Sequence, residues 1–324
     1  MKILILSGLA KSDIGGPTQY TGELAKEFQN LGHEVKIVSY TSMEKRMSVF
    51  LRHIYFLFKV VGKVIWSDKI LALDTYSTGV PAVLLSKLFR KKLIARVGGD
   101  YLWSAYVNRT SKPITLPLFY DRMPELSKKE RLIYLFMGWM IRHTDFLAFN
   151  TEWQRGIWQK FYRINESRSG VVRNFIPENR KEQIPSLNNF LWAGRLIPEK
   201  NIPMLKKLGI EIATGESHER ILERIKGCYA AVTLAFTDVC PNFIIEAVSF
   251  RKPFIATHET GLSEIFPIGG IYVNPLDDKE IERAMQALLD SGTYNKKVLE
   301  LDSLKLNHSW REMAQEYIEI WNRI

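Results

Sequence analysis

The chain has 324 residues, of which 46% are hydrophobic and 25% charged, the composition of a globular protein with a real core. Its length predicts one large domain or two medium ones. The two cysteines, Cys228 and Cys240, form no CxxC pair and have no histidine at metal spacing, which argues against a disulfide framework or a zinc site and favours a reducing cytosol.

The net charge of +10 is concentrated in the first half of the chain. Residues 1–170 hold 26 Lys and Arg against 14 Asp and Glu, a net +12, whereas residues 171–324 hold 19 against 21, a net −2. This split suggests two domains, of which the first meets something anionic, such as a membrane surface or a phosphorylated substrate. The basic residues stand among long aliphatic runs and not in a nucleic-acid module, so we do not expect a nucleic-acid partner.

Short apolar runs alternate with segments of helical period along the first half. The N-terminal MKILILSGLA is too short in its apolar part for a signal peptide, and residues 3–6 are predicted as the opening strand. A helix follows, with Tyr20, Leu24 and Phe28 on one face, and Gly32 ends it. Further strands are predicted at 35–40, 70–73, 93–97 and 146–150. This alternation predicts a parallel sheet with helices on both faces.

The second half repeats the alternation. Residues 169–176 are predicted as a strand and linker, and a fresh series of strands follows at 188–195, 210–214, 230–235, 253–257 and 270–274. Polar and proline-bearing residues interrupt the pattern near 170–187, so we expect domains at 1–172 and 173–308. Ser309 and Glu312 have capping-box spacing, which predicts a terminal helix over 309–324.

Two segments depart from ordinary surface helices. Residues 44–66 interleave five Lys and Arg with apolar and aromatic side chains, which fits either a core-packed helix or an interfacial helix on an anionic membrane. Residues 132–141 are apolar throughout and are predicted to be core-packed. Neither segment is long enough and free enough of charged residues to span a bilayer, which needs about twenty apolar residues. We expect a cytoplasmic protein, and the interfacial alternative would place it peripherally on the inner face of the membrane.

Two loops of the first half carry glycines at strand ends. Gly15 and Gly16 stand before a helix N-terminus, where they would permit an anion to approach, although such a pair is usually only a turn. Asp100 follows Gly98 and Gly99 at the end of a strand, where open α/β sheets bind ligands. It would either accept a hydrogen bond from a sugar hydroxyl or merely cap the next helix, and spacing alone favours the cap.

The second half carries two cations after its first strand. Arg195 and Lys200 are predicted to lie on the strand-to-helix loop of GRLIPEKN. Arginine offers a planar fork for phosphate oxygens and lysine a mobile point charge, so the pair suits a diphosphate whose charge grows as it leaves. The alternative is a solvated basic loop in which Glu199 neighbours Lys200.

Two carboxylates, Asp238 and Glu246, flank the start of a predicted helix. We expect Asn242 to cap this helix, so that its first amides can take a phosphate or a sugar oxygen. The spacing brings both carboxylates to one rim around the helix terminus. An acid that stabilises the helix dipole would explain one of them but less naturally both.

Together these residues carry a resemblance. GRLIPEKN, then DVCPNFIIEAVSFRKPFIAT and then TGLSEI resemble the retaining nucleotide-sugar glycosyltransferases of family 4 (glycosyl transferases group 1), which have the GT-B fold. That family typically shows Gly-Arg and Lys in the first loop and two glutamates eight positions apart in the second motif. The similarity also covers Gly32-His33-Glu34-Val35 and the Trp-bearing terminal helix, so it spans nearly the whole chain.

The resemblance implies an α/β GT-B fold, in which two Rossmann-like parallel-sheet domains face a cleft. The first domain would bind the acceptor, the second the nucleotide sugar, and the terminal helix would cross back to the first.

The resemblance also implies a role for each candidate residue. Arg195 and Lys200 would hold the donor diphosphate and stabilise the leaving group, and Glu246 would bind the ribose. Asp238 would contact the donor sugar, Asp100 would lie near the reacting sugar, and no metal would be needed. The remaining donor contacts would come from Gly15, Gly16, Asn242, Phe243 and Ile244.

The chain departs from the family at three places. Asp238 stands where the family has glutamate, glycines stand where many members have a histidine before Asp100, and the stretch from Lys200 to Asp238 is short, so the second domain is trimmed. The interpretation that follows is a retaining, metal-independent glycosyltransferase whose acceptor is a lipid-linked or cell-surface glycan precursor. The alternative is a catalytically weak or inactive sugar-nucleotide-binding homologue that acts as a partner protein. An epimerase or phosphorylase fits the motifs less well.

Overall fold

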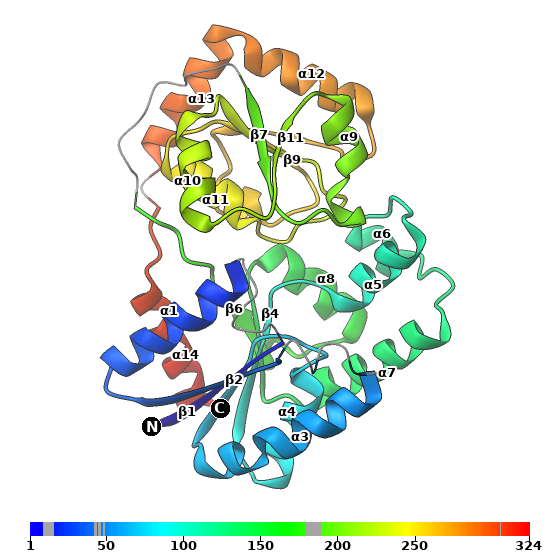
Figure 1. Ribbon diagram of the computed structural model, residues 1–324, viewed down its shortest axis with the longest axis vertical. Coiled ribbons are helices and arrows are strands. Elements are labelled where there is room, and N and C mark those ends of the chain that lie inside the picture. The colour runs from blue at the N-terminus through cyan, green and yellow to red at the C-terminus, as the bar shows by residue number, and fades with distance from the viewer. Residues whose placement is uncertain (9–15, 42–43, 45–46, 48, 179–188, 305) are drawn as a thin grey trace. The chain divides into compact units, whose positions relative to one another are not determined.

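Short apolar strands pair in parallel throughout the fold (Figure 1). The computed structural model describes residues 1–8, 16–41, 44, 47, 49–178, 189–304 and 306–324. The chain divides into two units. Unit 1 comprises Met1–Leu102, Leu126–Arg173 and Ser309–Ile324, and unit 2 comprises Trp103–Glu125 and Asn174–His308.

The sheet of unit 1 has six parallel strands in the order β2-β1-β3-β4-β5-β6. Their bounds are β1 (Lys2–Ser7), β2 (Glu34–Ser39), β3 (Lys69–Ala72), β4 (Lys92–Val97), β5 (Phe146–Phe149) and β6 (Ser169–Val171). Ile3 to Leu6 are fully buried because helices cover both faces of this strand, which is why its sequence is continuously apolar. The strands predicted for this half are confirmed, with ends that differ by a residue or two.

Strand order places the helices of unit 1. The chain passes from β1 to β2 on one side and then to β3 on the other, with Ile3 paired to both Val35 and Lys69. Right-handed crossovers therefore put α1 (Gly16–Asn30) on one face and α3 (Val49–Trp66) and α4 (Gly79–Leu88) on the opposite face. Helix α7 (Lys128–His143) packs against α4, and helix α8 (Glu152–Tyr162) packs on β5 and β6.

The last helix, α14 (Trp310–Arg323), packs against α1 within unit 1. Its predicted capping box is confirmed, because Ser309 Oγ accepts from the Glu312 amide while the Glu312 carboxylate accepts from the Ser309 amide. The buried hydroxyls of Tyr20 and Tyr317 lie 2.9 Å apart.

The sheet of unit 2 has five parallel strands in the order β11-β10-β9-β7-β8. These strands are β7 (Phe190–Ala193), β8 (Glu211–Ala213), β9 (Ala230–Thr233), β10 (Phe254–Thr257) and β11 (Gly270–Val273). The helices that follow them are α9 (Ile202–Lys207), α10 (His218–Gly227), α11 (Asn242–Ser249), α12 (Asp278–Leu289) and α13 (Ser291–Ser303). Between Lys200 and Asp238 the chain thus forms α9, β8, α10 and β9 in turn, and β8 has only three residues.

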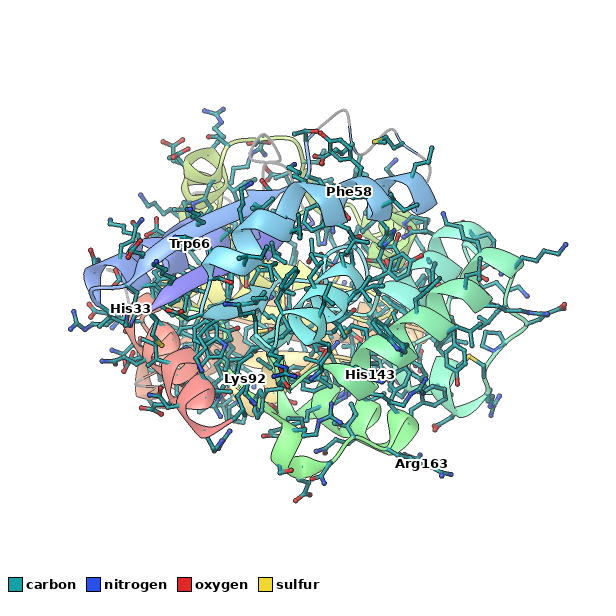
Figure 2. All side chains as sticks on the ribbon, turned by 90° about the horizontal axis from the view of Figure 1, so that it is seen from below. His33, Phe58, Trp66, Lys92, His143 and Arg163 are labelled. Carbon is teal, nitrogen blue, oxygen red and sulfur yellow. The ribbon has the colours of Figure 1, made fainter. Side chains whose placement is uncertain are left out.

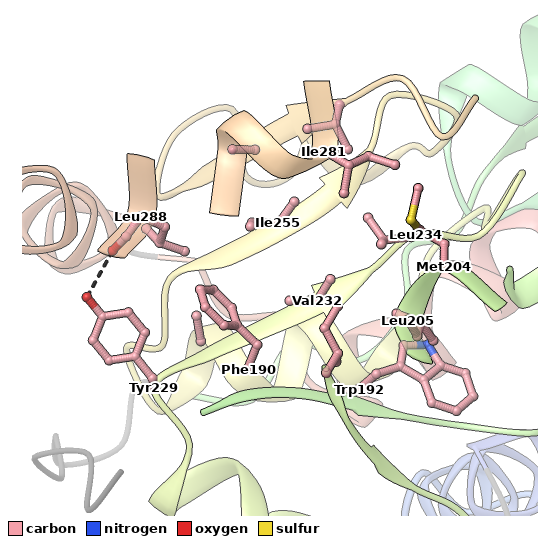
Figure 3. Packing of buried hydrophobic residues seen from close by; sticks show 14 residues of the cluster. Phe190, Trp192, Met204, Leu205, Tyr229, Val232, Leu234, Ile255, Ile281 and Leu288 are labelled. Atoms are coloured by element: carbon pink, nitrogen blue, oxygen red, sulfur yellow. Dashed lines mark hydrogen bonds between the residues drawn. The ribbon is translucent and has the colours of Figure 1, made fainter. Parts of the chain in front are cut away.

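Apolar side chains from the strands of unit 2 interlock with α9 and α12 (Figure 3). Leu205, Val232 and Ile281 are fully buried there, and Trp192 is nearly so. At one end of the cluster the hydroxyl of Tyr229 donates to the main-chain oxygen of Leu288 at 2.9 Å, which satisfies a polar group that burial would otherwise leave unpaired (Figure 3).

An early part of the chain belongs to unit 2. The segment Trp103–Glu125 holds most of α5 (Tyr101–Thr110) and all of α6 (Leu116–Asp121). It is joined to the rest of unit 2 through the buried amide of Leu116, which donates to Thr237 Oγ1 at 2.8 Å. We call Trp103–Glu125 the helical arm.

The two unusual apolar segments are helices, but only half of each is buried. In α7 the side chains of Ile133 and Met137 are buried, yet Leu132, Leu135 and Phe136 are exposed, so the prediction that 132–141 is core-packed is wrong for its outer face. The described part of 44–66 is mainly α3, which buries Phe56 and exposes its other side. Among the described residues, none of the helices combines the length and apolar character needed to cross a bilayer.

Candidate active site

The candidate site of unit 2 lies where its strand order reverses. The chain leaves β7 toward β8 on one side of it and then returns to β9 on the other side. Open α/β sheets bind ligands at the carboxyl ends of the strands at such a switch point. The loops that follow β7 and β9 carry Arg195, Lys200 and Asp238 to this edge.

The loop after β7 is tied to the loop after β9. Its short 3-10 turn, Pro198–Lys200, places Glu199 so that the main-chain oxygen accepts from the amide of Phe236 at 3.0 Å. The Glu199 carboxylate accepts from Ser104 Oγ of the helical arm at 2.5 Å. Arg195 is exposed, and Lys200 is mostly buried. The loop is therefore a fixed turn, in contrast to the alternative of a solvated basic loop.

Lys200 and Asp238 form an ion pair. Lys200 Nζ lies 2.5 Å from Asp238 Oδ2, and the two side chains are 18% and 20% exposed. The Asp238 amide donates to the main-chain oxygen of Glu259, the residue that follows β10 by two positions, at 3.1 Å. Asp238 is thus held by its own backbone and in turn orients the lysine.

The helix after this loop begins at Asn242, and Pro241 occupies the N-cap position without a side-chain cap. The prediction that Asn242 caps the helix is therefore wrong. Asn242 Oδ1 instead accepts from Asn174 Nδ2 at 2.9 Å, which ties the helix start to the linker. The amide of Ile244 donates to the Pro241 oxygen at 3.0 Å, so the amides of Asn242 and Phe243 are the ones that the helix leaves for a ligand.

Glu246 lies one turn into α11, and its Oε1 is 2.8 Å from Nε2 of His218, the first residue of α10. An ionised carboxylate only accepts hydrogen bonds, so Nε2 of His218 carries the proton in this contact. The histidine fixes one carboxylate oxygen and leaves the other available for a ligand hydroxyl.

A further carboxylate, that of Glu259, stands at the end of the neighbouring strand β10. Burial raises the pKa of this carboxyl above its ordinary value. Sequence reasoning did not select it, nor His218 or Thr237, because each matters through a contact with a residue distant in sequence. The nearest signal was the TGLSEI motif, which begins one residue after Glu259.

Two predicted site residues, Asp100 and Gly16, lie in unit 1. Asp100 lies in unit 1, is buried, and accepts from the indole Nε1 of Trp158 at 2.9 Å. Gly16 is the first residue of α1, also in unit 1. Gly15 lies outside the described residues. Within the part of the chain that the structure describes, no three His, Cys, Asp or Glu side chains are grouped so that they could hold a metal ion.

No family model matches the chain, and no curated protein sequence is similar to it. Solved structures are similar over its full length. Sucrose-phosphate synthase from Thermosynechococcus elongatus superposes with a TM-score of 0.74 at 11% identity, covering 100% of this chain and 99% of that one. HepE from Anabaena, in complex with UDP-glucose, superposes with a TM-score of 0.70 at 13% identity and 100% coverage of both chains.

A third structure, that of WaaG, a glycosyltransferase involved in lipopolysaccharide biosynthesis, superposes with a TM-score of 0.69 at 12% identity and covers 99% of both chains. All three similarities cover both parallel-sheet α/β units of this chain, of which one is six-stranded and one five-stranded. The predicted fold class is confirmed: the chain has the GT-B fold.

Proposed function

We propose that the protein is a retaining glycosyltransferase, of the family 4 type, which moves a sugar from a nucleoside-diphosphate sugar to an acceptor. The observation that carries this proposal is the Lys200–Asp238 pair at the switch point of unit 2, with Arg195 on the same loop and Glu246 one turn into the next helix. The similar HepE structure contains UDP-glucose, which supports a nucleotide sugar as the donor.

In this proposal the donor lies across the carboxyl ends of β7 and β9. Arg195 and Lys200 bind the diphosphate, the amides of Asn242 and Phe243 add hydrogen bonds at the helix start, and Glu246 accepts from the ribose hydroxyls. Ile244 contributes by holding this helix start, because its own amide is bonded to Pro241.

Bond cleavage between the sugar and the diphosphate leaves negative charge on the phosphate oxygens. Two cations at this position, of which Lys200 is held by Asp238, stabilise that charge as it develops, so the proposed mechanism requires no metal. Asp238 keeps Lys200 in place and offers its remaining oxygen to the donor sugar. The acceptor hydroxyl then bonds to the anomeric carbon on the face from which the nucleotide leaves and gives its proton to the departing phosphate oxygen, so the anomeric configuration is retained.

Unit 1 supplies the other proposed contacts. Asp100 would stand near the reacting sugar, with one carboxylate oxygen fixed by Trp158. Gly15 and Gly16 would allow the phosphates or the acceptor to approach the start of α1.

For the acceptor we propose a lipid-linked or cell-surface glycan precursor, met at the anionic inner surface of a membrane through residues 44–66. The excess of basic residues in the first half supports this, as does the mixture of lysine, arginine and aromatic side chains on α3. The similar WaaG is involved in lipopolysaccharide biosynthesis.

The donor is tested by thermal stabilisation with a panel of UDP and GDP sugars. A ligand at a hundred times its Kd stabilises the folded state by about 2.7 kcal/mol, so the matching nucleotide raises Tm clearly. With the matching donor, Arg195→Ala and Lys200→Ala are each expected to lower turnover about a hundredfold or more. The Tm of the free protein is expected to stay unchanged in Arg195→Ala, because Arg195 is exposed, and to fall in Lys200→Ala, which leaves Asp238 unpaired. Lys207→Ala, at an exposed lysine of the same unit that pairs with Asp278, is the control and retains activity.

Near-normal turnover in both site variants contradicts the assignment. Nucleotide-sugar binding without turnover, even with acceptor extracts, would instead support the inactive homologue. Two features favour this alternative: the aspartate at position 238 and the short stretch between Lys200 and Asp238.

A further inference from the structure

Large apolar side chains are concentrated on the outer surface of three helices of unit 1. Of the nineteen exposed large hydrophobic residues among the described part of the chain, eleven lie on α3, α4 and α7. Phe58 of α3 is 77% exposed, Leu88 of α4 is 69% exposed and Leu135 of α7 is 61% exposed. Figure 2 shows Phe58 on the outward side of its helix. Clustering of this kind marks an interaction surface, whereas single exposed leucines are ordinary.

Each helix uses a separate stripe for the core. In α3 the buried stripe contains Phe56, Val60 and Val64, while the exposed residues recur with helical spacing on the opposite side. In α7 the large buried hydrophobic residues are Ile133, Met137, Met140 and Ile141, and the large exposed ones are Leu132, Tyr134, Leu135 and Phe136. The outer apolar stripes are therefore surplus to the packing of unit 1. A helix that is apolar on both sides needs a second apolar environment.

The three stripes form one surface. Helix α4 packs against both α3 and α7 (Figure 1). Its own exposed residues, Leu84 and Leu88, therefore join the stripes of the other two helices. We call the exposed apolar residues of these helices the outer face. Its members are Leu51, Ile54, Tyr55, Phe58, Ile65, Leu84, Leu88, Leu132, Tyr134, Leu135 and Phe136.

The charges on these helices have one sign. Together α3, α4 and α7 carry eight Lys and Arg and a single acid, Glu130, which is buried in the capping box at the start of α7. Lys59 is neutralised by Glu44, and Lys87 by Asp145. Exposed cations remain at both ends of α7, with Lys128, Lys129 and Arg131 at its start and Arg142 at its end.

A cavity of about 730 Å³, lined by five Lys and Arg against the acids Asp145 and Glu166, adjoins the outer face at the C-terminal ends of α4 and α7. Its lining includes Lys92, Arg142 and Arg168. Arg168 donates to main-chain oxygens of Ile141 and Arg142 and so closes the end of α7, whereas Lys92 and Arg142 are exposed to solvent. The cavity adds positive groups beside the apolar stripes, where the phosphates of a bilayer surface would lie.

We infer that the outer face is a docking surface for an anionic lipid bilayer, formed by three helices and not by 44–66 alone. The apolar stripes enter the acyl boundary while the flanking lysines and arginines meet lipid phosphates. A second copy of the chain fits poorly, because a two-fold interface would bring the same cations against one another. The inference rests on the proposed function in one respect: membrane binding would give the enzyme access to a lipid-linked acceptor. The vesicle-binding test below does not depend on that function.

The test is sedimentation of the full chain with vesicles made of equal parts phosphatidylglycerol and phosphatidylcholine, beside vesicles of pure phosphatidylcholine. The protein is expected to sediment with the anionic vesicles at low salt and to be released as salt rises. Phe58→Glu, Leu88→Glu and Leu135→Glu each place a charge on a different stripe and are expected to weaken binding at least about fivefold, and the triple variant to abolish it.

Leu299→Glu is the matched control, since Leu299 is 68% exposed on α13 of unit 2. It makes the same change at equal exposure and is expected to bind as the wild type does. All four positions are solvent-exposed, so the folded state tolerates the glutamate, and thermal melts verify this. The double variant Lys128→Glu, Lys129→Glu tests how much the positive charges contribute to binding. It is expected to weaken binding to anionic vesicles and to leave sedimentation with pure phosphatidylcholine vesicles unchanged.

Absence of wild-type binding at low salt would overturn the inference, as would equal loss in Leu299→Glu. So would a dimer, measured by light scattering, that Phe58→Glu dissociates while vesicles remain unbound. Vesicle binding requires neither donor nor turnover. A protein that binds vesicles but no nucleotide sugar would keep this inference and lose the proposed function, and the reverse result would do the opposite.

Discussion

Lys200 Nζ lies 2.5 Å from Asp238 Oδ2, so the cation proposed to receive the donor's diphosphate already has an anionic partner. Both side chains are mostly buried, which makes the pairing stronger than a surface ion pair. An arriving phosphate must therefore share Lys200 with Asp238. The short aspartate side chain fits this geometry, because it reaches the lysine while its amide stays bonded to Glu259.

Asp238→Asn removes this competition and keeps an oxygen for Lys200. We expect UDP to bind as tightly as to the wild type or more tightly, while turnover falls about tenfold or more, because the lysine loses its orienting charge. Calorimetry with UDP and steady-state donor turnover measure the two effects. UDP affinity lowered as much as in Lys200→Ala would contradict the competition.

His218→Ala releases the Glu246 carboxylate from its hydrogen bond. A net hydrogen bond to a charged group is worth about 1.5–3 kcal/mol, and part of this is lost at an exposed position, so we expect KM for the donor to rise roughly tenfold with little change in kcat. His218→Gln can still donate to Glu246 and is expected to recover most of the loss. Equal effects of alanine and glutamine on KM would argue against a positioning role.

Glu259→Gln tests the cost of burying a carboxylate. Burial raises the folded-state pKa of Glu259 above its ordinary value of 4.5, so the stability linked to this group is fully present below pH 4.5 and is lost as pH rises through the folded value. The glutamine variant escapes this loss. Its Tm is expected to exceed that of the wild type at neutral pH, and the difference to vanish in acid.

Melting curves across this pH range measure the Glu259 effect, with Glu223→Gln on the exposed side of α10 as the control for loss of one charge. A Tm difference that stays constant with pH would show that the carboxyl does not titrate differently in the folded state.

Tyr20 and Tyr317 join α1 to α14 through their buried hydroxyls. We expect Tyr20→Phe to lower the free energy of unfolding by about 1–2 kcal/mol, since it removes the hydrogen-bond partner of the Tyr317 hydroxyl, and Tyr317→Phe to cost less, because Tyr20 keeps its hydrogen bond with Arg96. The double variant should cost less than the sum. A double-mutant cycle from denaturant unfolding gives the coupling, and strict additivity would mean that the hydroxyls do not interact.

The sequence predicts the strands of both sheets because their apolar runs are short, β-rich and separated by helical periods. It also predicts the capping box at Ser309, which depends only on residues three apart. The segment 132–141 shows what such patterns cannot predict. A run that is apolar throughout contains no information on which side faces the core, so Leu135 could not be distinguished from Met137.

Contacts between distant segments set a second limit. Pro241, and not Asn242, takes the N-cap position, and the Asn242 side chain is bonded to Asn174, sixty-eight positions earlier. The pairing of His218 with Glu246 and the attachment of Leu116 to Thr237 likewise depend on tertiary structure alone. Of the predicted site, the structure brings Arg195, Lys200, Asp238 and Glu246 to neighbouring elements of one unit, as the loop positions after parallel strands require.

The packing of α14 on α1 also determines which unit can be completed first while the chain is being synthesised. Phe28 and Trp321 have ring centroids 5.7 Å apart, and the Tyr20–Tyr317 bond spans 297 positions of sequence. A ribosome therefore releases all of unit 2 before it delivers the helix that covers α1. Until then the growing chain exposes the buried side of α1, so unit 2 is complete in the nascent chain before unit 1 can be closed.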